Sequence, residues 1–169
     1  MEMAPAVGGE ASGGPRTVAE LAAAAERPAV RELGLLLRAA TRLDRAVDAA
    51  MRAECGLSHT MFEVLLMLAR ARGAGIPQRE LAEGLTLTSG GTTRLVDRME
   101  QAGLVRRTPS PADRRITLVG ATPEGAEAFG RATVVHARIV DRLFLAPVAE
   151  EDRPPLLAAL RAIVENPED

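Results

Sequence analysis

Apolar residues recur at alternating steps of three and four positions from Leu33 to Ala50, which places them on one face of an α-helix. The stripe is continuous and predicts a long helix over about residues 30–54, which Gly56 ends. Upstream, Thr17 and Glu20 have the spacing of a capping box, and Pro28 is expected to stop the helix that they start. A short extra helix is therefore predicted over residues 17–28. Residues 1–16 are rich in Gly, Pro, Ala and Ser, and we expect them to form a disordered tail.

Further helices follow the long one. Ser58 can cap a helix whose apolar positions again have helical spacing. Two shorter helices are predicted over about residues 77–84 and 88–102, and a tight turn separates them. The last two helices are expected over about 122–145 and 149–165.

The one clear β signal lies between these groups of helices. Leu104–Thr108 and Ile116–Val119 are rich in strand-forming residues, and the Pro, Ser and Asp residues between them predict a turn. Two short helices followed at once by a two-stranded hairpin are typical of a winged helix-turn-helix. The fold class is therefore predicted as mainly α, with a two-stranded wing. The expected regions are a winged helix-turn-helix over 57–121 and dimerisation helices over 29–56 and 122–165.

The second helix of such a unit presents a polar face to a DNA groove. Helical spacing places Ser89, Gly90 and Thr93 opposite the apolar Leu95, and the free amides at the helix start can hold a phosphate. Gly90 either lets the DNA backbone approach closely or is simply tolerated near a helix start, and both interpretations stay open. The candidate DNA contacts of this helix are Thr88, Ser89, Gly90, Thr92, Thr93 and Arg94.

Charge adds a local feature. The 169 residues contain 21 basic residues, all of them arginine, and 23 acidic residues, so the net charge of −2 excludes a general polybasic coat. Residues 86–118 nevertheless carry six arginines and three acidic residues, a net charge of +3 that leaves −5 for the rest. At the far end of the hairpin loop, Arg114 and Arg115 can enter a minor groove while Asp113 fixes their direction. The alternative is an exposed turn with an ordinary ion pair.

With these motifs, the sequence resembles the MarR family of regulators, most strongly over residues 78–125. The specific signal is a D-x-R wing followed by a T-P-E-G helix start. The resemblance implies a homodimeric repressor that binds a pseudo-palindromic operator on double-stranded DNA. It also places Ser89, Thr93 and Arg94 on the recognition helix, and Asp113, Arg114 and Arg115 at the wing tip. Pro154 and Pro155 depart from the family pattern and are expected to interrupt the last helix.

The apolar surface of the long helices independently favours a homodimer, because it exceeds what one small winged helix buries; a larger monomeric helical core is the alternative. The resemblance further implies a small-molecule effector that releases the protein from DNA. Candidate ligand residues are Arg38, Arg42, His59 and Phe62. The competing interpretation is an ordinary solvated arginine or a helix-start histidine.

Two other functions remain open: a redox-responsive regulator that acts through Cys55, and a winged-helix module that binds proteins and not DNA. Cys55 ends a helix, away from the field of a helix start that activates a thiol, and the chain has no second cysteine. With His59 and His136 it offers too few ligands for zinc. We expect no metal, no cofactor and no catalytic residues, and therefore no enzyme. No apolar run is long enough to cross a membrane. The single Cys55 excludes a disulfide framework and fits a reducing cytoplasm, so we expect a cytoplasmic protein.

Overall fold

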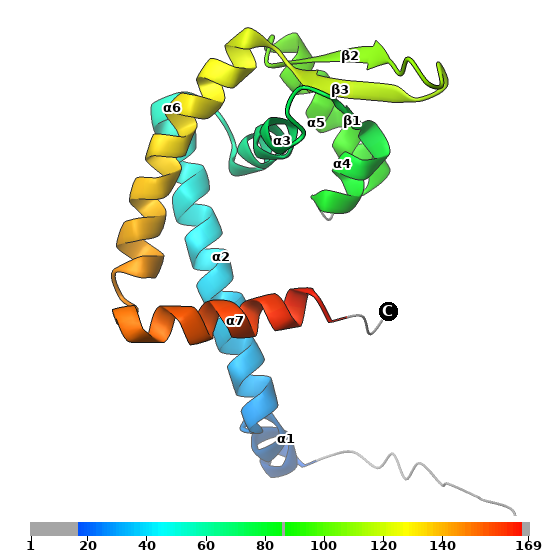
Figure 1. Ribbon diagram of the computed structural model, residues 1–169. Helices are drawn as coiled ribbons and strands as arrows, with labels where there is room; N and C mark the ends of the chain where they lie inside the picture. The colour runs from blue at the N-terminus through cyan, green and yellow to red at the C-terminus, as the bar shows by residue number, and fades with distance from the viewer. Residues whose placement is uncertain (1–16, 86, 167–169) are drawn as a thin grey trace, which may run out of the picture. The chain divides into compact units, whose positions relative to one another are not determined.

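The computed structural model describes residues 17–85 and 87–166; the tail expected over residues 1–16 lies outside this part of the chain. The chain divides into two compact units, Met1–Ala40 and Thr41–Asp169. Helix α2 (Pro28–Cys55) begins in the first unit and ends in the second (Figure 1).

The described part of the first unit contains helix α1 (Val18–Ala25) and the start of α2. The predicted capping box is present, because the Thr17 hydroxyl accepts from the Glu20 backbone N–H at 3.2 Å and the Glu20 carboxylate accepts from the Thr17 N–H at 2.8 Å. The helix ends earlier than the predicted limit of 28. Pro28 opens α2 and does not close α1, since its fixed φ and missing N–H suit a first helical turn.

The second unit combines helices with a small sheet. Its elements after α2 are α3 (His59–Arg70), β1 (Ile76–Pro77), α4 (Gln78–Gly84), α5 (Ser89–Gln101), β2 (Val105–Pro109), β3 (Thr117–Ala121), α6 (Pro123–Val140), the π-helical turn η1 (Asp141–Leu145), the 3₁₀ turn η2 (Glu150–Asp152) and α7 (Arg153–Val164). The predicted order of helices around one hairpin is thus confirmed.

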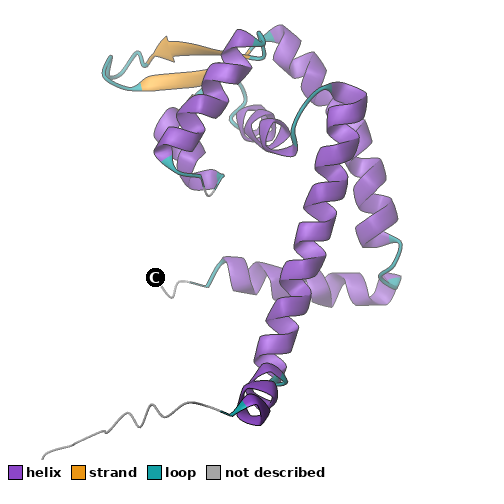
Figure 2. Cartoon of the chain, turned by 180° about the vertical axis from the view of Figure 1, so that it is seen from behind, coloured by secondary structure: helices purple, strands orange, loops and turns teal. Residues whose placement is uncertain are grey.

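The sheet is antiparallel, with the strand order β1-β3-β2. The β2–β3 hairpin is the expected wing, and its register pairs Val105 with Ala121 and Pro109 with Thr117. Figure 2 shows that the hairpin projects from the helices, with its loop at the free end. Strand β1 is not predicted from the sequence, because two residues are too few to show strand alternation. Its Ile76 pairs with Val119 and so joins the start of α4 to the wing.

One apolar core holds this unit together. It takes side chains from the last turns of α2, from α3, α4, α5 and α6, and from both wing strands. The largest fully buried apolar side chains are Met51, Leu65, Leu81, Met99, Val64, Val96, Val105 and Val119. The helix-turn-helix and the base of the wing are therefore fixed to one another by packing.

The wing passes into α6 through a tight junction. Thr122 caps α6, since its hydroxyl accepts from the Gly125 N–H at 3.0 Å and donates to the Gly103 carbonyl at 2.6 Å. A Cβ on Gly125 would lie 1.9 Å from the carbonyl oxygen of Leu104. The T-P-E-G segment therefore lets the start of α6 pack directly against the backbone before β2.

The C-terminal helices differ in detail from the prediction. The helix expected to run from 122 to about 145 changes to π-helical geometry over its last turn, at η1. We expected Pro154 and Pro155 to interrupt the last helix, but they do not. They lie in the first turn of α7, where the backbone N–H groups have no intrahelical acceptor.

We expect Gly125→Ala to lower the free energy of unfolding by at least about 2 kcal/mol, because the added methyl group must displace backbone. Gly130→Ala is the matched control on the same helix: nothing lies within 4 Å of a Cβ there, so the variant should gain up to about 1 kcal/mol from helix propensity. Urea unfolding followed by circular dichroism measures both values. Equal stabilities would contradict the proposed role of the junction.

Candidate DNA-binding site

The α4–α5 pair forms a helix-turn-helix. Leu81 and Ala82 are buried on α4. In the turn, the Leu87 N–H donates to the Ala82 carbonyl at 3.2 Å. The Leu87 side chain itself is exposed.

Helix α5 shows the polar face that its spacing predicts. Its buried residues include Leu95, Val96 and Met99, whereas Ser89, Gly90, Thr93 and Arg94 are exposed. Thr88 caps the helix and accepts from the Gly91 N–H at 3.2 Å. The exposed residues therefore form one continuous candidate surface at the start of the helix.

Thr92 does not belong to this surface. Its side chain is 1% exposed, and its hydroxyl donates to the Thr88 carbonyl at 3.2 Å. Thr92 was among the predicted DNA contacts, but its position one step before Thr93 turns it toward the core. We therefore remove Thr92 from the candidate DNA contacts.

Gly90 has open space around it. No heavy atom lies within 4 Å of a Cβ built on this residue, so no contact inside the protein requires glycine here. Both interpretations of this residue stay open: close approach of a DNA backbone, or mere tolerance of glycine near a helix start.

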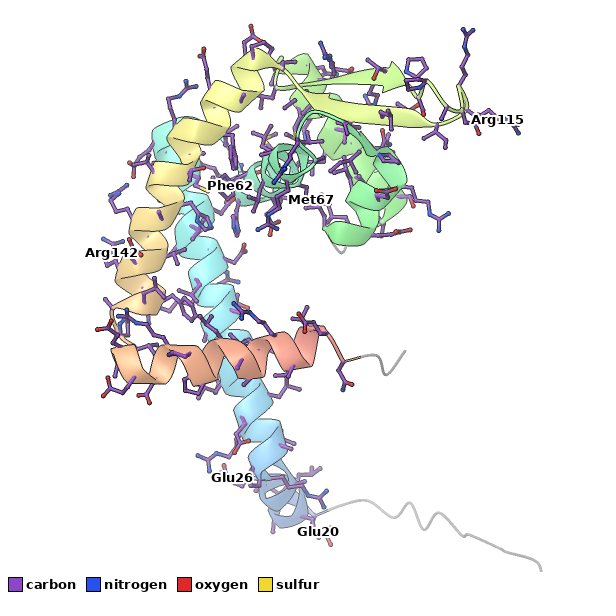
Figure 3. The ribbon with its side chains drawn as sticks, in the orientation of Figure 1. Glu20, Glu26, Phe62, Met67, Arg115 and Arg142 are labelled. Carbon is purple, nitrogen blue, oxygen red and sulfur yellow. The ribbon has the colours of Figure 1, made fainter. Side chains whose placement is uncertain are left out.

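At the wing tip, Asp113 contacts Arg115, as the D-x-R spacing predicts. The Asp113 carboxylate accepts from the Arg115 backbone N–H at 3.0 Å and lies 3.6 Å from the Arg115 guanidinium Nε. The loop is closed at its base, where the Ser110 N–H donates to the Ile116 carbonyl at 2.8 Å. The Arg115 side chain is 93% exposed and extends away from the hairpin (Figure 3). A short ordered loop thus presents a guanidinium to the surroundings.

The arginines of residues 86–118 are not equivalent. Five of them are exposed: Arg94, Arg98, Arg106, Arg114 and Arg115. The Arg107 guanidinium, in contrast, contacts Asp97 and Glu100 at 2.7 Å each. Burial alone would lower the pKa of Arg107, but the hydrogen bonds that its guanidinium donates to these two carboxylates outweigh it and raise that pKa above its usual range. The sequence alone predicts no role for Arg107 beyond its charge, and none for Gln78, which also contacts it.

The structure brings together some of the candidate ligand residues. His59 and Phe62 are stacked with ring centroids 6.3 Å apart, but Phe62 is 4% exposed and packs on Phe129 and His136. Phe62 is therefore a core residue in this structure. Arg42 is exposed in the second unit, and Arg38 is exposed in the first.

His59 is held by two acidic residues of α2. Its Nδ1 lies 2.7 Å from an Asp44 carboxylate oxygen, and its backbone N–H donates to Asp48 at 2.9 Å. The hydrogen bond from Arg52, together with the His59 N–H, keeps the pKa of Asp48 below its ordinary value. Asp48 thus secures the start of α3 to the end of α2.

We also searched the described part of the chain for a metal site, a reactive cysteine and a membrane-spanning helix. Among residues 17–85 and 87–166, no group of three or more His, Cys, Asp or Glu side chains could hold a metal ion. Cys55 is a half-buried free cysteine that ends α2. None of the described helices is both long enough and apolar enough to span a membrane.

A helix-turn-helix that continues into an ordered, arginine-tipped wing defines the class of winged helix-turn-helix proteins. The profile of the MarR family matches residues 56–116. The transcriptional regulator PecS of Dickeya dadantii is 34% identical over 136 residues, which cover 79% of this chain and 80% of PecS. The chain therefore belongs to the MarR family of transcriptional regulators.

Solved structures agree with this assignment. A mutant of Escherichia coli MarR in complex with operator DNA has a TM-score of 0.69 at 26% identity, covering 78% of this chain and 93% of that protein. CouR from Rhodococcus jostii RHA1, bound to p-coumaroyl-CoA, has a TM-score of 0.68 at 30% identity, covering 78% of this chain and 90% of CouR. These structures support the mainly helical fold with a winged helix-turn-helix.

We expect the free energy of unfolding to fall as the pH drops below about 6.5. Burial, followed by the nearby His59 charge, lowers the pKa of His136 from its ordinary value of 6.5, so the folded state favours neutral His136. The stability from His136 is present above the pKa of the unfolded chain and is lost as the pH falls through the folded value. Replacing His136 by Gln should flatten this dependence, as measured by urea unfolding between pH 8 and pH 5. An unchanged slope would contradict the assignment.

Proposed function

We propose that this regulator is a homodimeric repressor that binds a pseudo-palindromic operator through two winged helices and leaves it when a small organic anion binds. The main support for this DNA-binding surface is the shared core, which fixes the exposed start of α5 and the base of the wing in one unit. The operator complex of the related E. coli protein supports this mode of binding.

Each part of the surface has a distinct role in the proposal. The free amides at the start of α5, with Thr88 and Ser89, hold a phosphate. Thr93 and Arg94 reach base edges in the major groove, where arginine is suited to guanine. Gly90 leaves room for the DNA backbone beside them.

The wing supplies the second contact. Arg114 and Arg115 enter a neighbouring minor groove, where a narrow A/T-rich sequence concentrates negative potential. Asp113 directs Arg115 through the hydrogen bond to its backbone and the ion pair with its side chain.

The proposed effector is a lipophilic or aromatic anion, the class suggested by the p-coumaroyl-CoA bound to the related CouR. Arg42 and His59 are candidate contacts in the second unit, and Arg38 is a separate candidate in the first. Phe62 would line such a site only after a rearrangement of its aromatic stack. The effector acts by binding more tightly to a form in which the recognition helices no longer match the operator.

The proposal includes no catalytic activity. Within the described part of the chain, neither histidine pairs with a nucleophilic side chain. His59 contacts Asp44, and both histidines lie in the aromatic stack. The protein acts where the chromosomal DNA is, in the cytoplasm.

Arg115→Ala should weaken binding to the cognate operator by at least about 1 kcal/mol, because a guanidinium is lost from the minor groove. Arg131→Ala, which removes an exposed arginine from α6, is the matched control and should bind as the unmodified protein does. Fluorescence anisotropy with the protein's own upstream DNA, at several salt concentrations, measures both affinities. Binding that lacks sequence preference and salt dependence would instead favour a protein-interaction module.

Dimerisation is tested on the first part of α2, where Leu33 and Leu36 are 55% and 40% exposed. We expect the unmodified protein to sediment as a dimer and Leu36→Glu to shift it toward the monomer, because a carboxylate would be buried at the interface. Ile116→Glu alters an equally exposed residue of the wing loop and should leave the dimer intact. A dimer that persists in Leu36→Glu would contradict the use of this stripe.

A further inference from the structure

Arg107 lies on wing strand β2, but its side chain is directed into the protein and is only 22% exposed. Its guanidinium donates to Glu100 at 2.7 Å and pairs with Asp97 at 2.7 Å, and both carboxylates belong to α5. The Glu100 carboxylate also accepts from the Arg107 backbone N–H at 3.0 Å. A wing strand and the recognition helix are thus joined by charge-assisted hydrogen bonds at several points.

Gln78, the first residue of α4, extends this link. Its side-chain oxygen accepts from Arg107 Nε at 3.0 Å, and its side-chain nitrogen donates to the Thr93 hydroxyl at 3.0 Å. Thr93 in turn donates to the Ser89 carbonyl at 3.0 Å. A chain of hydrogen bonds therefore runs from the wing, through α4, to the exposed start of α5.

This chain ends on a candidate base-reading side chain. The Thr93 hydroxyl has one proton, which it gives to Ser89, so it can offer DNA only a lone pair that Gln78 does not use. Arg107 itself cannot reach DNA in this arrangement, because Glu100, Asp97 and Gln78 occupy its guanidinium. Its effect on DNA binding must then be indirect.

We propose that Arg107 and Gln78 are positioning residues that set sequence selectivity without touching a base. They hold the recognition helix at a fixed place relative to the wing and fix the orientation of the Thr93 hydroxyl. This inference rests on the proposed DNA-binding function. It matters because the wing and α5 must fit adjacent grooves at the same time, and a small error in their relative position loses contacts in one of them.

The test compares Arg107→Lys and Gln78→Met with the unmodified protein. Lysine keeps the charge but lacks the planar fork that joins Gln78, Asp97 and Glu100, and methionine keeps the length of Gln78 without its hydrogen bonds. The probes are a duplex selected from a random pool by the unmodified protein and a scrambled duplex of the same composition. Arg106→Lys is the matched control, since Arg106 precedes Arg107 on β2 and is exposed.

In both variants we expect the ratio of affinities for the selected and scrambled duplexes to fall about tenfold, the size of one lost base contact. Affinity for the scrambled duplex and the slope of log affinity against log salt should stay unchanged, because no phosphate contact is removed. Arg106→Lys should keep the ratio. A purely structural defect would lower the affinity for both duplexes together, in step with the melting temperature.

Besides that loss of affinity for both duplexes, three outcomes would overturn the inference. The first is an unchanged ratio in Gln78→Met, which remains decisive even where Arg107→Lys fails to fold. The second is a salt slope that falls by about one in a variant at 107 that removes the charge, such as Arg107→Gln, which would make Arg107 a phosphate contact. The third is an unmodified protein that selects no sequence, which would overturn the proposed function itself; selective binding by the unmodified protein separates that case from the first two.

Discussion

The rotation of α5 about its own axis decides which side chains this protein can offer to DNA. That rotation is fixed by burial: Thr92, Leu95, Val96 and Met99 all enter the core. A turn of the helix by one position would expose several of these apolar side chains and bury Arg94, which costs several kcal/mol through lost apolar burial and an unpaired charge. The packing of the core therefore determines which side chains of α5 are left to face DNA. The wing is held in place as well, because β2 and β3 supply Val105 and Val119 to the same core.

Features that depend on contacts between residues close together in the chain are predictable from the sequence. Caps are local, so Thr17, Ser58 and Thr122 mark helix starts from a few residues of context, and each accepts the expected backbone hydrogen bond. Helical periodicity is also local, and it placed Ser89 and Thr93 on the exposed face of α5. The hairpin is predictable for the same reason, because its two strands and the turn between them are consecutive in the chain.

The parts that were missed depend on residues far apart in the chain. Strand β1 exists only because Ile76 meets Val119, and the need for glycine at 125 appears only when the Leu104 carbonyl is placed beside it. The link from Arg107 to Gln78 spans 29 positions. Thr92 was misjudged for a subtler reason: threonine is polar enough to be expected at the surface, yet its hydroxyl can bond to the carbonyl four residues earlier and leave a methyl group for the core.

The charge distribution acquires a different meaning once the contacts are known. A net charge of +3 over residues 86–118 suggested a basic surface, but one of its six arginines is neutralised by Asp97 and Glu100. Arg107 and these two carboxylates together carry a net charge of −1, while the other five arginines remain exposed. The absence of lysine suits both uses. An exposed guanidinium is suited to a narrow minor groove, and a partly buried one can join three side chains in one plane, which a lysine ammonium cannot do. The same residue type thus builds the surface that meets DNA and the link that holds that surface in place.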